Sequence, residues 1–142
     1  MAYLKHSRVQ FFITTIRSQC RKCNVRFSLS KGYEVNIDGE RVQGYFQEPV
    51  HSRYAHGVLR VGIGSRRTSD WLYTLAHEYA HFLQWMRDDP IFDTPHYYDL
   101  EAQTETEALA ICREFKLPIP RRVLLKEHHR YMKKLGRTRL LQ

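Results

Sequence analysis

The sequence predicts a single protein domain of the α+β class, in which helices pack on a small sheet. Three observations predict this class. Apolar residues recur at helical spacing near the N-terminus, short alternating segments with glycine-containing turns follow, and the second half carries long helical patterns broken by prolines. The chain has 142 residues, of which 42% are hydrophobic and 27% charged. It is therefore long enough to bury one core and too apolar to be disordered.

The first half predicts one helix and a small antiparallel sheet. The helix covers residues 3–19, because apolar side chains repeat there with a period of three to four residues. These side chains are Val9, Phe12, Ile13, Ile16 and Cys20. Alternating segments predict strands at 25–29, 33–37, 41–46 and 57–63. The second and third strands form a hairpin on the turn Asp38-Gly39, because Asp-Gly favours the positive φ angles of a tight hairpin turn.

The second half predicts three helices, at 69–88, 98–116 and 121–135. Ser69 supplies a capping hydroxyl for the first, and Asp70 places an acid in its first turn. Pro90 ends that helix, and Pro118 and Pro120 separate the second helix from the third.

Charge is distributed unevenly along the chain. Residues 1–69 hold 12 Lys/Arg and 4 Asp/Glu, residues 70–120 hold 3 and 10, and residues 121–142 hold 8 and 1. The basic flanks predict either contact with nucleic acid or an acidic partner surface, or a solubilising role. We expect residues 1–120 to form the domain, with 121–142 as a basic C-terminal helix and tail that packs on it or extends from it.

The apolar and cysteine patterns predict a cytoplasmic protein. The longest apolar run near the N-terminus is Phe11-Phe12-Ile13, which is too short for a signal peptide or a membrane span, so no membrane contact is expected. Cys20 and Cys23 have the spacing of half a zinc knuckle, but no second pair supplies the remaining ligands. Together with Cys112 they are an odd number of cysteines, which favours free thiols.

The predicted helix 69–88 contains His77-Glu78-Tyr79-Ala80-His81, the pattern H-E-x-x-H. Residues four apart lie on one face of a helix, so His77 and His81 can bind one Zn²⁺. Glu78 then lies beside the metal, where it can accept a proton from water during hydrolysis. The alternative is two surface histidines with an ordinary contact between them.

A catalytic zinc needs a third protein ligand, and two regions could supply it. In the predicted helix 98–116, Glu101 and Glu105 lie on the same stripe as apolar residues, so both face inward, whereas Glu107 faces solvent. Inward carboxylates are costly unless they are paired or bind a metal. The other source is His96, fifteen residues after His81. The residues alone leave these alternatives open.

The segment 59–118 resembles the gluzincin metallopeptidases, in particular the small ImmA/IrrE type and related phage-encoded proteins. The resemblance rests on the strand Leu59–Ile63, on Leu75-Ala76 before the motif, and on Leu100-Glu101-x-Gln103-small-Glu105-x-x-Ala108. It implies a zincin-like fold with one Zn²⁺ per chain. It also implies that Glu101 is the third ligand and that Glu105 supports a ligand histidine. The chain departs from the family pattern in two ways: Glu105 replaces the more usual Asp or Asn, and a turn of helix is inserted before Leu117-Pro118. The insertion leaves open a shifted register with Glu105 as ligand.

A second resemblance concerns His96. Proteases of the SprT type combine H-E-x-x-H with a third histidine at about this distance and act on DNA-bound proteins, which the basic flanks would suit. If His96 is not a ligand, His96 or Tyr97 could donate a hydrogen bond to the oxyanion of a tetrahedral intermediate or contact substrate.

These observations predict a metallopeptidase that hydrolyses a peptide bond in a protein or peptide substrate. His77, His81 and Glu101 would hold the zinc, and Glu78 would activate the water. The resemblance implies a regulatory protein as substrate, and it casts Leu59–Ile63 as the edge strand that pairs with the substrate backbone. A non-catalytic zinc-binding adaptor is the remaining alternative, although such a protein has no use for Glu78.

Overall fold

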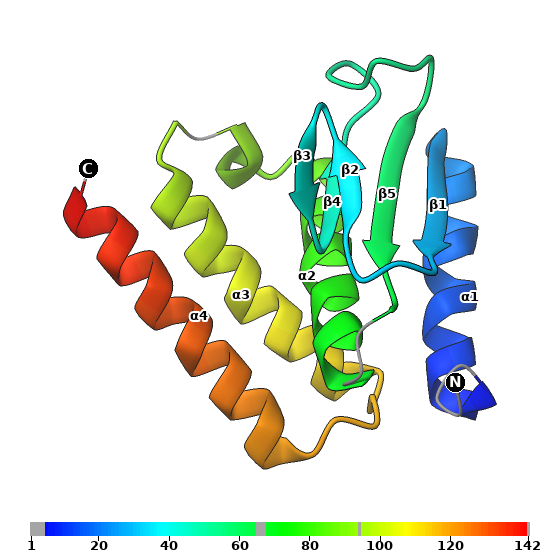
Figure 1. Cartoon of the computed structure of the whole chain (residues 1–142). Helices are drawn as coiled ribbons and strands as arrows, with labels where there is room; N and C mark the ends of the chain where they lie inside the picture. Colours follow the sequence, from blue (N-terminus) through cyan, green and yellow to red (C-terminus); the bar gives the residue numbers. More distant parts are fainter. Residues whose placement is uncertain (1–4, 65–67, 94, 142) are drawn as a thin grey trace.

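The computed structural model describes residues 5–64, 68–93 and 95–141. Within this part of the chain lie four α-helices and five strands, which confirms the α+β class (Figure 1). In chain order the elements are α1 (Ser7–Lys22), β1 (Val25–Ser30), β2 (Val35–Ile37), β3 (Glu40–Val42), β4 (Gly44–Gln47), β5 (Gly57–Gly62), α2 (Thr68–Met86), a 3₁₀ turn (Pro90–Asp93), α3 (Tyr97–Glu114) and α4 (Arg121–Leu141). Residues 3 and 4 of the predicted first helix lie outside the described part.

The main sheet has three strands in the order β1-β5-β4. The prediction of an antiparallel sheet is wrong for one pair, because β1 and β5 run parallel while β4 and β5 are antiparallel. The physical reason is the long connection over residues 31–56, which returns the chain to its starting end before β5 begins. Since β5 is paired on both sides, the expected peptide-binding edge at Leu59–Ile63 is also wrong, and β4 is an edge strand instead.

The hairpin predicted on Asp38-Gly39 is confirmed, because β2 pairs with β3 in antiparallel fashion. Asp38 and Gly39 have φ angles of 49° and 88°, as the tight turn requires. The Gly39 N–H also donates to Oδ1 of Asn36 at 3.0 Å. The predicted strand 41–46 is divided, however. Its second half leaves the hairpin after Gln43 and joins β5 as β4.

Helices α1 and α2 pack on the sheet and form the core with it. The five apolar side chains predicted for the inner face of α1 are all buried. The ring of Phe12 on α1 meets Tyr79 on α2 edge-on at 5.9 Å, and the side chain of Phe12 is fully buried. Burying one such side chain contributes about 2 kcal/mol, so this contact between α1 and α2 helps to fix the position of α2.

Helix α3 packs against α2, and α4 packs along α3 (Figure 1). Leu124 and Leu135 of α4 are buried, so this helix has an inner face as well as a charged outer one. No helix in the described part of the chain is long and apolar enough to cross a membrane.

Candidate metal centre

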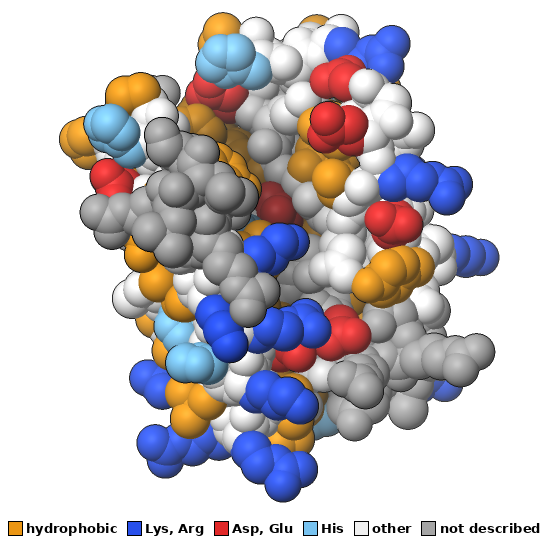
Figure 2. Space-filling model, turned by 60° about the vertical axis from the view of Figure 1, so that its left-hand side comes forward, with side chains coloured by type: hydrophobic (Ala, Val, Ile, Leu, Met, Phe, Trp, Pro, Cys, Tyr) orange, Lys and Arg blue, Asp and Glu red, His pale blue; other side chains and the backbone are white. Residues whose placement is uncertain are grey.

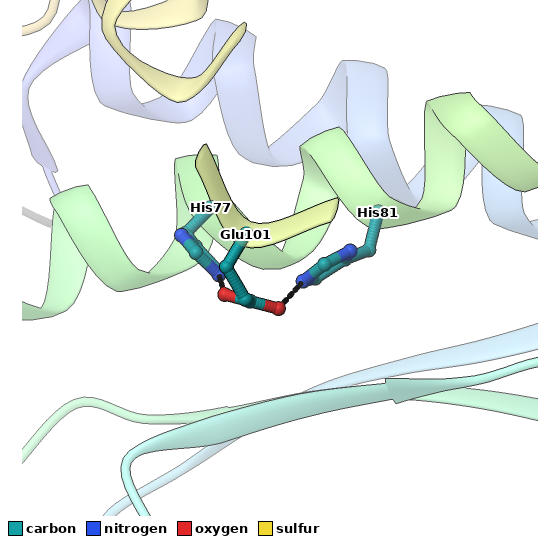
Figure 3. A group of neighbouring side chains, drawn as sticks. All are labelled: His77, His81 and Glu101. Atoms are coloured by element: carbon teal, nitrogen blue, oxygen red, sulfur yellow. Dashed lines mark ion pairs between the residues drawn. The ribbon is translucent and has the colours of Figure 1, made fainter. Parts of the chain in front are cut away.

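Helix α2 places two histidines on one side of the helix. The rings of His77 and His81 are four residues apart, and their centroids lie 4.9 Å from each other (Figure 3). His77 is buried and His81 is partly buried. Both imidazoles therefore point the same way, toward α3.

Glu101 of α3 lies between the two histidines (Figure 3). Its Oε2 is 2.9 Å from Nε2 of His77, and its Oε1 is 3.1 Å from Nε2 of His81. One ligand atom from each of these three residues lies within 4.8 Å of the others, so the group could hold a metal ion. Imidazole nitrogen and carboxylate oxygen are donors that zinc accepts, so the chemistry of the residues fits this ion.

The electrostatics of the group favour a positive charge at this point. Burial lowers the pKa of His77, but hydrogen bonds to Glu101 and Glu105 outweigh burial and raise the pKa to about 10. Burial likewise raises the pKa of Glu101, but the hydrogen bonds to His77 and His81 hold it down to about 2. A protonated histidine is thus stabilised between carboxylates, which is the place where a cation would be bound.

Glu105 lies behind His77, on the side away from Glu101. Its Oε1 is 2.5 Å from Nδ1 of His77, and its side chain is fully buried. Its Oε2 accepts a hydrogen bond of 2.5 Å from the hydroxyl of Tyr73. Sequence reasoning missed Tyr73, although the signal was present, since Tyr73 precedes His77 by four residues and shares its face of α2.

His81 has a polar neighbour on its other nitrogen. Nδ1 of His81 is 3.5 Å from Oγ1 of Thr104, which donates to the Leu100 carbonyl at 2.7 Å and accepts from Nε2 of Gln84 at 3.1 Å. These polar side chains anchor α2 to α3 beside the candidate metal position.

The expectation that Glu107 is solvated is wrong. This side chain is partly buried and accepts a hydrogen bond of 2.7 Å from Nε2 of Gln84. It also forms an ion pair with Arg87. The contacts explain the difference, because Gln84 of α2 and Arg87, which directly follows α2, both reach Glu107 across the packing of α3 on α2.

Glu78 faces the cavity beside the candidate metal position. Burial raises its pKa, and the neighbouring histidines and a hydrogen bond from the Phe46 backbone N–H of β4 offset this only in part. The cavity measures about 420 Å³ and is lined by His77, Glu78, His81 and Glu101 together with residues of β3, β4 and α4. A carboxylate with a raised pKa beside a metal position is suited to accept a proton from water and to release it again.

The structure gives different positions to His96 and Tyr97, the two residues expected as alternative ligand or oxyanion donors. His96 precedes α3 as its N-cap residue and is exposed, and it belongs neither to the group around Glu101 nor to the lining of the cavity. Tyr97 does line the cavity, although 52% of it is exposed.

Tyr131 of α4 also lines the cavity, with its ring 5.3 Å from that of His77. The sequence predicted a basic helix at 121–135 that packs on the domain or extends from it, and none of its residues was assigned to the site. The signal was a stripe at offsets of four, seven and eleven residues, which places His128 and Tyr131 on the same face as Leu124 and Leu135.

The three cysteines are free thiols, as the sequence predicted. Cys20 and Cys112 are buried and Cys23 is partly buried. Among the described residues, the group that could hold a metal contains no cysteine.

Comparisons with known protein families, with curated proteins and with solved structures found no match for this chain. The gluzincin resemblance therefore remains an expectation from the motif, and the functional argument depends on the geometry of the site itself.

Proposed function

We propose that this protein is a zinc-dependent metallopeptidase. The observation that carries the proposal is the convergence of His77, His81 and Glu101 from two helices, with Glu78 beside them in an open cavity. A purely structural zinc site is closed by four protein ligands, whereas a catalytic site keeps a position open for water or substrate. Three ligands and an adjacent carboxylate favour the catalytic kind.

Each residue of the site has a role in peptide hydrolysis. When bound, zinc polarises the substrate carbonyl and acidifies water. Glu78 accepts the proton of the attacking water and returns it to the departing amine, and the Phe46 N–H holds its carboxylate in place. Tyr97 and Tyr131 line the same cavity. Their hydroxyls are candidate donors to the oxyanion. Burial raises the pKa of both tyrosines, so both keep the proton that they would donate.

Strand β4 supports a peptide as substrate. The carbonyl of Gln43 accepts from the N–H of Gly62 on β5, so residues 43, 45 and 47 direct their backbone groups toward β5. Gly44 directs its N–H and C=O to the outer edge, and so does Phe46, because successive residues of a strand alternate. The N–H of Phe46 already donates to Glu78, so the groups left for a peptide are those of Gly44 and the carbonyl of Phe46. Gln43 and Gly44 also line the cavity. An extended peptide that paired with this edge would run past Glu78.

The test is hydrolysis by the zinc-loaded chain and by Glu78→Gln. We expect the wild type to cleave a mass-spectrometric library of peptides and fluorescein-labelled casein. Glu78→Gln should retain zinc and lose at least about 100-fold in rate, because general-base catalysis contributes on that scale. Glu114→Gln, at an exposed position at the end of α3, is the matched control and should keep the wild-type rate. Cleavage that is equal in wild type and Glu78→Gln would contradict the proposed mechanism, because it would not depend on Glu78. Absence of cleavage from both proteins with zinc bound would contradict the proposal and leave a zinc-binding adaptor.

A further inference from the structure

Helix α4 directs a polar side chain toward the candidate metal centre. Nδ1 of His128 lies 3.4 Å from the hydroxyl of Tyr73 and 3.7 Å from Oε2 of Glu105. Tyr73 is buried, and His128 is partly buried on the inner stripe of α4. One oxygen of Glu105 therefore faces His77, and the other faces a tyrosine of α2 and a histidine of α4.

We propose that Tyr73 and His128 are positioning residues of the metal centre, which act by holding the Glu105 carboxylate against His77. The inference rests on the proposed zinc site. Glu105 has no exposed surface, so protein groups must supply the hydrogen bonds that water would give elsewhere. Held in this way, Glu105 accepts the Nδ1–H of His77, which leaves the lone pair of Nε2 directed at the metal. The C-terminal helix is then part of the site.

The first test compares two tyrosines of the same helix. Tyr79 is also buried on α2 but packs against Phe12 and Phe82, away from the carboxylates. Zinc affinity is measured on the full chain by competition with a chromophoric chelator, which requires no substrate. We expect Tyr73→Phe to weaken zinc binding about 10-fold, as loss of an outer partner typically does. Tyr79→Phe should stay within about twofold of wild type.

The second test compares neighbouring histidines of α4. His129 is exposed, whereas His128 reaches Tyr73 and Glu105. We expect His128→Ala to weaken zinc binding and His129→Ala to leave it unchanged. Because Tyr73 and His128 act through one carboxylate, the double variant Tyr73→Phe/His128→Ala should lose less than the sum of the single free-energy changes.

The outcomes separate this inference from the proposed function. If Tyr73→Phe and His128→Ala both bind zinc with the wild-type affinity, the positioning role is overturned and the metal site itself stands. Equal loss in Tyr73→Phe and Tyr79→Phe also overturns it, because the loss would then reflect the folding of α2. A wild-type chain that takes no zinc overturns the proposed function and this inference together.

A second, independent feature of α4 is the set of basic side chains that it exposes. The described side chains of this helix include six Lys/Arg, all exposed, and one partly buried glutamate. The six are Arg121, Arg122, Lys126, Arg130, Lys133 and Lys134. Of these, Lys134 belongs to the side of the metal centre, because it lines the cavity there. Figure 2 shows Lys and Arg side chains gathered over this part of the molecule. Arg122, Lys126, Arg130 and Lys133 follow each other at steps of four, four and three residues, which forms one row about 16 Å long.

From this row we infer that the outer face of α4 binds the phosphate backbone of nucleic acid. A regular row of cations matches a polymer with one negative charge per nucleotide. A protein partner would favour an apolar centre in the interface, yet the large hydrophobic side chain exposed on the described part of α4 is Leu125 alone, at 39%. Nucleic acid bound to this face would lie on the side of α4 opposite to the metal centre.

The test is binding of a fluorescein-labelled 20-base-pair DNA duplex over a series of salt concentrations. We expect the triple variant Arg122→Gln/Lys126→Gln/Lys133→Gln to bind more weakly. Its slope of log affinity against log salt should be smaller by about 2 to 3, because each lost phosphate contact removes about 0.9.

The control Arg21→Gln/Lys22→Gln/Arg26→Gln removes the same charge from exposed cations of α1 and β1. It should keep most of the slope. An equal decrease in both variants would mean that net charge attracts the duplex and no surface is selected. Absence of DNA binding at low salt would leave the row as a solubilising face or a site for an acidic protein, and either result overturns the inference.

Discussion

Two glutamates one turn apart on α3 make different contacts. Glu101 touches both His77 and His81 through their Nε2 atoms, whereas of these two histidines Glu105 touches His77 alone, through Nδ1. We expect Glu101→Ala to abolish stoichiometric zinc binding and Glu105→Ala to weaken it by about 10- to 100-fold. Isothermal titration with zinc would measure both. Retention of tight binding by Glu101→Ala with loss in Glu105→Ala would show that the register is shifted.

The sequence could place these residues on one inward stripe but could not assign their roles. The roles depend on how far α3 is displaced along α2, which is set by packing between helices. Tyr73 and Tyr131 were missed for the same reason, since each is an ordinary core-type residue until α3 and α4 are docked.

The cysteines differ in burial, and we therefore expect them to differ in reactivity. Burial, with a smaller effect of Cys23, raises the pKa of the Cys20 thiol from 9.0 to about 12, and burial with the charge of Glu105 does the same for Cys112. We expect Ellman's reagent to modify Cys23 first at pH 8, with the other two reacting only on unfolding. Three thiols that react at one rate in the folded chain would contradict this assignment.

The same shifts predict how stability depends on pH. The Cys20 and Cys112 thiols each have a higher pKa in the folded chain than in the unfolded chain. Their contribution to stability is therefore fully present below pH 9 and is lost as the pH rises toward 12. The free energy of unfolding measured in urea should therefore decrease over this range. Replacing Cys20 and Cys112 together by Ala should make that decrease smaller, since these thiols supply part of it.

At the scale of elements, the contact of α1 with α2 is tested by adjacent phenylalanines. Phe12 is fully buried, whereas 65% of Phe11 is exposed. We expect Phe12→Ala to cost about 3–5 kcal/mol of unfolding free energy, from lost burial and the cavity left behind. Phe11→Ala should cost less than about 1 kcal/mol. Urea denaturation of both variants would measure the difference, and similar costs would contradict the orientation of α1.

The elements and the one hairpin followed from local patterns, and the pairing of strands in the main sheet did not. The hairpin on Asp38-Gly39 was predicted because its turn chemistry is local. The parallel pairing of β1 with β5 and the edge position of β4 depend on contacts between distant segments, which one sequence does not encode as a visible pattern. This is why β5, which is the central strand, was expected to be an edge strand.

At the scale of the whole molecule, the candidate metal centre joins α2 and α3 from opposite sides of one site. A ligand that binds only the folded chain stabilises it, by about 4 kcal/mol when its concentration is 1,000 times Kd. For a chain of this size that corresponds to an increase in Tm of roughly 8–16 °C. We expect EDTA to lower the Tm of the zinc-loaded wild type by this amount. The Tm of Glu101→Ala should not respond to zinc or EDTA, and an equal response in both proteins would place the zinc elsewhere.

The most direct test of the central claim is the zinc content of the purified full chain, measured by mass spectrometry after zinc loading and gel filtration. The geometry predicts one zinc per chain in the wild type and in His96→Ala, and none in His81→Ala or Glu101→Ala. His96 is exposed outside the group, so its variant is the internal control. Loss of zinc from His96→Ala with retention in Glu101→Ala, or a wild-type chain that holds no zinc, would contradict the assignment of His77, His81 and Glu101 as the metal site.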